Sequence, residues 1–301
     1  MAHIVRAAPW ATPGSTGSAD GLAEASEVAT AALRLDIAEA AALIGHLSRP
    51  PAGRKWTALT TDGGVVMAST STKDTDDAEG PAGHIDLLAV HPSAQGHGRG
   101  RALVRAAEEW LAGQGVRQVR FAGNTPCYAW PGIDVRYTAA ACLAERLGYE
   151  RYSVVWNMTA DLSVDLSVED DLERLARHGV TVHAAGDDRG RVTAFVREHF
   201  NDSWAWEAAQ AAGVHYGERD GRVLGFAAWG ARPAWFGPTG TAPDARGLGL
   251  GRVLLRRCLA DQRAAGQADA QIGWVGPLRF YSRAVGARAE RVFWLYRRDL
   301  A

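Results

Sequence analysis

The sequence has few cysteines, and their arrangement excludes two kinds of stabilising site. Cys127, Cys142 and Cys258 are the three present, and they are widely separated and odd in number. They fit no zinc-binding spacing and no disulfide framework, so we expect a protein of a reducing compartment without a metal site. No histidine accompanies them in a local signature, which argues against a cysteine nucleophile.

Charge of one sign and long apolar runs are also lacking. The formal net charge is −1 at pH 7, which argues against a large basic surface for a nucleic acid. No apolar stretch reaches the roughly 18 residues of a membrane-spanning helix, and residues 1–10 contain no apolar run of signal-peptide length. We therefore expect a cytoplasmic protein with no nucleic-acid or membrane partner. The sequence does not indicate its oligomeric state.

What the sequence does contain is a long internal repeat. Residues 90–103 recur as residues 241–254, so that Pro92 matches Pro243, and three glycines of each copy match as well. The chain has 301 residues, about twice the length of a usual compact domain, and its hydrophobic content of 47% is enough for two cores. The chain is therefore interpreted as a duplication.

The surroundings of the two copies repeat in kind. Each copy is preceded by two strand candidates joined by a turn with an Asp-Gly start, which is a hairpin signal, and by a third strand. Each is followed by a helix, which ends near a glycine. After this helix come a strand, a short helix and a final strand or pair. The expected strands are 56–61, 65–71, 84–90, 116–122, 214–219, 223–229, 235–241 and 268–273, and the expected long helices are 101–112 and 252–264. This order predicts an α/β (α+β) fold in each half, with a mixed and mostly antiparallel sheet flanked by helices.

Composition suggests where the two halves meet. The segment that follows residue 161 is polar and acidic, which gives a first domain of residues 1–162, a linker of residues 163–177 and a second domain of residues 178–301. Within the linker, a helix can begin at Val168. Residues 11–25 are rich in Pro, Gly and Ser, and we expect them to form an exposed loop.

The glycine segments have a direct physical use. A strand that runs into Gly-x-Gly and then into a helix turns several backbone N–H groups inward, and the helix start adds its own unpaired N–H groups and the positive end of its dipole. Such a turn forms a cradle for a pyrophosphate. A dinucleotide fingerprint fits less well, because the third glycine falls one position early and hairpins precede it. No Lys-Ser/Thr follows either copy, which excludes a Walker loop.

The pattern Val-x-Pro-x-x-Gln-x-x-Gly-x-Gly at 90–100, repeated as Thr-x-Pro-x-x-Arg-x-x-Gly-x-Gly at 241–251, resembles motif A of the GNAT family of N-acetyltransferases. The tandem arrangement resembles that of two-domain members such as mycothiol synthases. The resemblance implies acetyl-CoA or another acyl-CoA as donor, with its pyrophosphate on the loop amides and its pantetheine arm beside the preceding strand. The implied donor-binding residues are Leu88, Ala89, Val90, Gln95, Gly96, His97, Gly98, Arg99, Gly100 and Arg101 in the first half, and Thr239, Gly240, Thr241, Arg246, Gly247, Leu248, Gly249, Leu250, Gly251 and Arg252 in the second.

The resemblance also implies one catalytic residue. The family commonly uses a tyrosine on the short helix after the fifth strand to protonate the departing thiolate, and Tyr281 resembles it, whereas the first half has no tyrosine at either possible equivalent. Tyr281 lies five residues before Gly286 instead of four, so either Val285 takes the place of the glycine or the helix is shifted by one. A tyrosine of the apolar core is the alternative interpretation of Tyr281.

A general base is not apparent in the second half. Its strand 234–241 carries no carboxylate. Asp202 and Glu207 lie in the region that lines the acceptor site in this family, but a helix cap by Asp202 or Ser203 and a solvated Glu207 is the simpler interpretation. The roles of His199 and His215 stay open.

Polar residues of the first half are equally unassigned. His84 and Asp86 share one face of their strand with Leu88, as strand alternation requires. The segment 125–137 is an insertion relative to the second half, and it either covers a ligand or packs between the domains.

We expect the second half to acylate the amine of a small molecule, while the first half is degenerate. Two other classes stay open, a non-catalytic acyl-CoA-binding protein and an acetyltransferase that acts on a protein amine. The many aromatic residues of the second half favour a small, partly apolar amine over a highly charged polymer. The sequence does not identify the acceptor or the acyl chain.

Overall fold

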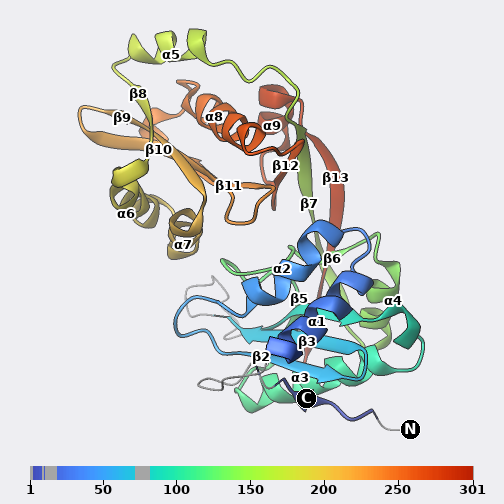
Figure 1. The fold of residues 1–301 in the computed structure, drawn as a ribbon. Coiled ribbons are helices and arrows are strands. Elements are labelled where there is room, and N and C mark those ends of the chain that lie inside the picture. Colours follow the sequence, from blue (N-terminus) through green and yellow to red (C-terminus); the bar gives the residue numbers. More distant parts are fainter. Residues whose placement is uncertain (1–2, 9, 11–18, 72–81, 301) are drawn as a thin grey trace. The chain divides into compact units, whose positions relative to one another are not determined.

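The protein is described from a computed structural model, which covers residues 3–8, 10, 19–71 and 82–300. The chain forms two compact units (Figure 1). Unit 1 comprises Met1–Val155 and Phe293–Ala301, and unit 2 comprises Trp156–Val292.

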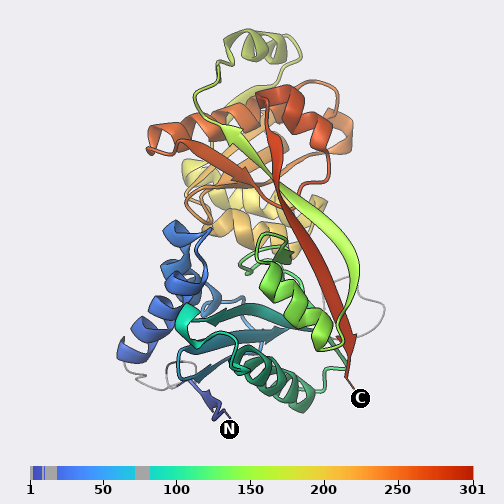
Figure 2. The same ribbon diagram turned by 90° about the vertical axis from the view of Figure 1, so that its right-hand side faces the viewer.

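The elements of unit 1 are, in chain order, β1 (Arg6–Ala7), α1 (Ala19–Ala32), α2 (Ile37–Leu47), β2 (Trp56–Thr61), β3 (Gly64–Thr70), β4 (Ala82–Val90), the 3₁₀ turn η2 (Pro92–Ala94), α3 (Arg99–Gly113), β5 (Gln118–Phe121), β6 (Ile133–Asp134), α4 (Thr138–Arg146) and the first half of β7 (Glu150–Asp161). α1 and α3 pack on opposite faces of the sheet (Figure 2). Leu103, Ala107 and Leu111 of α3 are fully buried, as their helical spacing predicts.

The elements of unit 2 are the second half of β7, α5 (Glu169–Ala176), β8 (Thr181–Ala184), the 3₁₀ turn η3 (Gly186–Asp188), α6 (Arg189–His199), α7 (Asp202–Gln210), β9 (Gly213–Arg219), β10 (Arg222–Trp229), β11 (Trp235–Thr241), the 3₁₀ turn η4 (Pro243–Ala245), α8 (Leu250–Ala264), β12 (Asp269–Ile272), α9 (Leu278–Val285) and the start of β13 (Arg288–Asp299). Two apolar clusters form its core. One involves α8 and α9, and the other involves α6 and α7.

Each unit has a mixed sheet with one parallel pair. Unit 1 has the strand order β1-β2-β3-β4-β5-β13, and unit 2 has the order β7-β12-β11-β10-β9-β8. β4 runs parallel to β5, and β11 runs parallel to β12, whereas both hairpins are antiparallel. Asp220 and Gly221 turn the second hairpin with φ of 52° and 74°, as an Asp-Gly turn with two left-handed residues requires. The predicted fold class is confirmed.

The last strand of each half pairs in the sheet of the other unit. Residues Tyr296–Asp299 of β13 pair with β5 in unit 1, whereas Met158–Asp161 of β7 pair with β12 in unit 2. The observed units therefore differ from the boundaries suggested by composition, 1–162, 163–177 and 178–301. Alternation along a strand fixes which face is buried but not which sheet it joins, so the sequence pattern carried no sign of this exchange.

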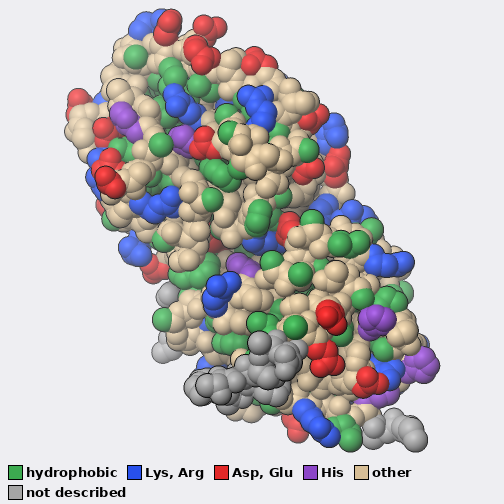
Figure 3. Space-filling model, viewed as in Figure 1, with side chains coloured by type: hydrophobic (Ala, Val, Ile, Leu, Met, Phe, Trp, Pro, Cys, Tyr) green, Lys and Arg blue, Asp and Glu red, His purple; other side chains and the backbone are tan. Residues whose placement is uncertain are grey.

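The predictions for residues 11–25 and for the linker have different outcomes. Residues 11–18 of the expected loop lie outside the described residues, and from Ala19 the chain forms α1, so the loop prediction was wrong over 19–25, where alanines favour a helix. The acidic linker contains the helix α5, with Val168 as its N-cap, where the sequence allows a helix to begin. None of the described helices is long and apolar enough to cross a membrane. Acidic and basic side chains are intermixed on the face shown in Figure 3.

Candidate donor and acceptor sites

The two glycine loops have the same backbone. Gly96 and Gly98 have φ of 79° and 85°, and their counterparts Gly247 and Gly249 have φ of 84° and 83°. These left-handed values favour glycine. Gly98 and Gly249 are the N-cap residues of α3 and α8, so each loop leads directly into a helix start.

Each loop presents a row of unpaired amides. Within the described part of the chain, no group accepts a hydrogen bond from the backbone amides of residues 96–100 or 247–251. Consecutive N–H groups around left-handed residues make an anion-binding nest, and the helix dipole adds positive potential. The geometry suits a phosphate group at either loop.

The strand before each loop has an edge without a ladder partner among the described residues. β4 pairs with β5 at Ala82–His84 and then diverges from it, and β11 pairs with β12 at Trp235 and Phe236 and then diverges. Residues 88–90 and 239–241 lie beyond these points. An extended ligand can add to such an edge as another strand does.

A basic side chain from outside the repeat contacts each loop at the same place. Arg174 of α5 donates from Nη1 to the carbonyl of Leu248 at 2.7 Å, and the Nε2 of His3 lies 2.5 Å from the carbonyl of His97. Leu248 and His97 are matched positions, each between two left-handed glycines. Arg174 also pairs with Asp171 at 2.7 Å. A guanidinium paired with a carboxylate therefore lies against the second loop.

The register of the short helix follows from its packing on the loop. A Cβ built on Gly100 would lie 3.0 Å from Leu143 of α4, and one built on the matched Gly251 would lie 3.6 Å from Phe280 of α9. Leu143 and Phe280 therefore occupy equivalent places, and so do the residues that follow them, Ala144 and Tyr281. Gly148 and Gly286 are nevertheless both left-handed, with φ of 83° and 66°, so the glycines match and the helix of the second half is shifted by one residue.

Tyr281 lies against two aromatic rings. Its ring centroid is 4.9 Å from that of Phe280 and 6.2 Å from that of Phe236, and the residue is 7% exposed. Burial raises the pKa of Tyr281 to about 12, so the hydroxyl keeps its proton at neutral pH. Within the described residues, no group forms a hydrogen bond with this hydroxyl. A buried polar group usually has such a partner, so the hydroxyl is available to a ligand.

Three other sequence candidates, Asp202, His215 and His199, have structural partners. Asn201, and not Asp202 or Ser203, caps α7 by accepting from the amide of Trp204 at 2.8 Å, so that capping prediction was wrong. Asp202 is exposed and pairs with an arginine at 2.8 Å. His215 lies 2.7 Å from the Asp261 carboxylate. His199 stacks on a phenylalanine ring at 4.4 Å.

Glu207 differs from these residues because it has no partner. Within the described residues, its carboxylate makes no hydrogen bond or ion pair, and burial raises its pKa to about 8. On α7, Glu207 shares a face with Trp204, three residues earlier, and Trp204 stacks on Phe200 at 5.2 Å. Phe200 packs on Gly240 of β11 so closely that no Cβ fits there. Glu207 therefore lies one helical turn from a tryptophan that stacks beside the donor strand. The sequence did not reveal that this side chain is half-buried.

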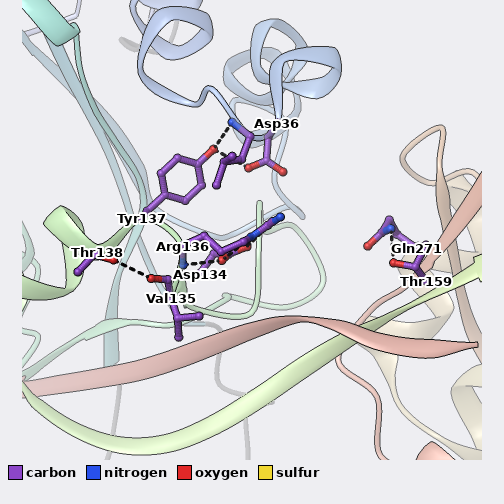
Figure 4. Close-up of polar contacts among 9 residues, drawn as sticks. Asp36, Asp134, Val135, Arg136, Tyr137, Thr138, Thr159 and Gln271 are labelled. Atoms are coloured by element: carbon purple, nitrogen blue, oxygen red, sulfur yellow. Dashed lines mark hydrogen bonds and ion pairs between the residues drawn. The ribbon is translucent and has the colours of Figure 1, made fainter.

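The insertion of the first half is tied to its own unit. Tyr137 points at Asp36, to which its hydroxyl donates at 2.7 Å, and it accepts from the amide of Leu35 at 3.0 Å (Figure 4). The guanidinium of Arg54 donates to the carbonyl of Cys127 at 3.0 Å. These contacts anchor the segment against α2 and the turn before it.

Tyr137→Phe should therefore lower the free energy of unfolding by about 1 kcal/mol, because it removes the hydrogen bonds to the Asp36 carboxylate and from the Leu35 amide. Urea unfolding of both proteins measures this difference. An unchanged unfolding free energy would show that the segment is held by other contacts.

Comparison with known proteins agrees with this geometry. A model of the Acetyltransferase (GNAT) family matches residues 26–129 and 180–284, one match in each half and together more than half of the chain. The chain belongs to the GNAT family. It is an N-acetyltransferase by family, and the family uses acetyl-CoA as donor. Within the described residues, no three His, Cys, Asp or Glu side chains gather as metal ligands do.

Curated relatives from the GNAT family cover most of the chain. The mycothiol acetyltransferase of Thermomonospora curvata is 29% identical over 226 residues, which is 67% of this chain and 68% of that protein. The mycothiol acetyltransferase of Geodermatophilus obscurus is 30% identical over 243 residues, which is 72% of each chain.

Solved structures show the same fold at low identity. A glucosamine N-acetyltransferase region of a fungal multi-domain β-N-acetylglucosaminidase has a TM-score of 0.75 and 19% identity, over 98% of this chain and 38% of that one. A tandem GNAT protein from the clavulanic acid biosynthesis pathway has a TM-score of 0.61 and 17% identity, over 85% of this chain and 86% of that one.

Proposed function

We propose that unit 2 transfers the acetyl group of acetyl-CoA directly to the amine of a small molecule within a ternary complex. The observation that carries this proposal is Tyr281, whose hydroxyl has no partner within the described residues, on a helix packed against the second glycine loop. The equivalent residue of unit 1 is Ala144, which has no proton to give. The catalytic role therefore falls to the second half.

The donor is held by backbone groups. Its pyrophosphate lies on the amides of residues 246–252, and its pantetheine arm runs beside Thr239–Thr241, where the strand edge has no ladder partner in the described part of the chain. In unit 1 the matching groups are residues 95–101 and 88–90. Holding the thioester at a fixed edge supplies the proximity that acyl transfer needs.

The chemistry consists of one substitution at the thioester carbon. The amine nitrogen attacks, the C–N bond forms and the C–S bond breaks. Glu207 accepts the amine proton, and the Tyr281 hydroxyl gives its proton to the departing thiolate. A carboxyl with a pKa of about 8 and a phenol with a pKa of about 12 suit these opposite roles.

A small-molecule acceptor is supported by two observations. The curated relatives carry the name mycothiol acetyltransferase, which refers to a small molecule. Phe200, Trp204 and Phe226 form an aromatic cluster beside the donor strand, which suits a partly apolar ligand.

The test is release of free thiol from acetyl-CoA with a panel of primary amines, each paired with the alcohol of the same shape. Amine-dependent release is expected for at least one member of the panel. Binding of acetyl-CoA without release in any mixture would instead identify a non-catalytic acyl-CoA-binding protein.

Glu207→Gln should lower kcat/KM roughly 100-fold or more at neutral pH, because the base is lost. In the unsubstituted protein, kcat/KM should rise with pH and level off above about 8, where Glu207 is ionised. The variant should lose this rise. Initial rates at saturating donor between pH 6 and 10 measure both effects.

Glu198→Gln is the matched control, because that side chain is 78% exposed on the neighbouring helix. Its kcat/KM should stay unchanged. Equal pH profiles in the Glu207→Gln variant and the unsubstituted protein would remove Glu207 from the mechanism.

A further inference from the structure

The strand β4 contains a bulge that redirects one carboxylate. Leu87 pairs with Met67 and Ile85 pairs with Ala68, so Asp86 is an extra residue without a partner in the β3 ladder. The ladder to β5 ends two residues earlier, at His84. Bulges commonly re-aim a side chain near a functional site, and this one lies where the two strands begin to separate.

The second half has the same bulge without the carboxylate. Ala227 pairs with Thr239 and Trp229 pairs with Phe236, which leaves one extra residue in β11. The position matched to Asp86 is Gly237, with φ of 125°. The acid at the bulge is therefore a property of unit 1.

Two acceptor atoms near this bulge are buried and unsatisfied. The Nδ2 of Asn124 donates to the Oγ of Ser69 at 2.7 Å, and Ser69 also hydrogen-bonds to Asp86. Oδ1 of Asp86 and Oδ1 of Asn124 have no partner in the described residues and almost no solvent contact, and Asn124 as a whole is 1% exposed. Unsatisfied buried acceptors are rare, and each needs an explanation.

The surrounding groups do not satisfy these oxygens. Arg54 donates from Nη1 to the carbonyls of Asn124 and Cys127 at 2.8 and 3.0 Å, and from Nη2 to that of Thr125. The Nδ1 of His84 lies 2.9 Å from the carbonyl of Ala122. Burial raises the pKa of Asp86 to about 7, against the opposing effects of Ser69 and Arg54, so the carboxyl is partly ionised at neutral pH.

We propose that unit 1 binds a primary amine, as its ammonium ion, at the bulge, with Oδ1 of Asp86 and Oδ1 of Asn124 accepting its N–H groups. An ammonium carries three donors and one positive charge, and it supplies the hydrogen-bond donors that these two buried oxygens lack, one of them on a carboxylate. The first half thus has an amine-binding site of its own. Ala144 stands in place of the tyrosine there, so the site binds an amine without the proton donor of unit 2.

The test follows the titration of Asp86 by carbon-13 NMR in the full chain with labelled aspartate carboxyl groups. The probes are methylamine, n-butylamine and glucosamine, with methanol, n-butanol and glucose as their hydroxyl counterparts. A resonance that titrates near pH 7 should move to lower pH on addition of an amine, in a saturable way, and should not respond to the alcohols. Ser69→Ala, which removes a bond to the carboxylate, should move the same resonance to higher pH and so assign it.

Asp86→Asn should lose this resonance and weaken amine binding to unit 1 roughly 10- to 100-fold in calorimetry, as expected for a lost charge-assisted hydrogen bond. No amine effect on the titration, or an equal effect of the alcohols, would overturn the proposal and leave a cluster satisfied by water. Unchanged amine affinity in Asp86→Asn would also overturn it, because the amine would then bind elsewhere.

Discussion

Gly249→Val is expected to abolish acetyl transfer, whereas Gly98→Val should leave it largely intact. Gly249 has φ of +83°, which a β-branched residue rarely adopts, and a Cβ there would meet the guanidinium of Arg174. The substitution therefore distorts the second nest. Gly98 is its match in the loop of the half that has no equivalent of Tyr281.

The matched control for backbone strain is Gly266→Val. Gly266 follows α8 with φ of +87°, and a Cβ there would meet no atom within 4 Å. This variant should lose stability as Gly249→Val does, and it should keep its donor affinity. Acetyl-CoA affinity by calorimetry and thiol release separate the two effects. Loss of turnover in Gly98→Val with full turnover in Gly249→Val would mean that the halves have the opposite roles.

Tyr281→Phe should lower kcat by about 10²–10⁴-fold, the usual contribution of a general acid. The KM for acetyl-CoA should change little, because protonation of the thiolate occurs mainly in the transition state. The ring packing against Phe236 and Phe280 is kept, so the melting temperature should stay close to that of the unsubstituted protein. Steady-state kinetics and thermal unfolding measure these three quantities.

Tyr216→Phe provides the control in the same unit. The Tyr216 hydroxyl donates at 2.7 Å to the Asp188 carboxylate, which is 48% exposed, so its loss should reduce stability by at most about 1 kcal/mol and leave kcat unchanged. If Tyr281→Phe retained full kcat, Tyr281 would be a core residue and water or another group would protonate the thiolate.

Sequence reasoning worked best where structure is set by local residues. The predicted strands 56–61 and 235–241 coincide with β2 and β11, and the helix expected at 252–264 is α8, which begins at Leu250. Left-handed glycines and Asp-Gly turns fix the backbone by themselves. The internal repeat then predicted the positions of both glycine loops, because a match over many positions carries more information than any single motif.

Sequence reasoning failed where contacts between distant residues decide the outcome. The exchange of β7 and β13 depends on which sheet edge each strand reaches. Both strands have 12 residues, so their lengths do not distinguish them. The raised pKa of Glu207 depends on what covers α7. The redirected Asp86 depends on a bulge in the ladder between β3 and β4, which strand alternation alone does not show.

The most direct test of the account is a set of initial velocities with acetyl-CoA labelled in its acetyl group and the best amine of the panel, both varied. Direct transfer in a ternary complex predicts double-reciprocal lines that intersect, with the label on the amine nitrogen and none on the protein. Parallel lines with label bound to the protein would identify an acetyl-enzyme intermediate and contradict direct transfer. Thiol release that does not depend on the amine would contradict N-acetyl transfer itself.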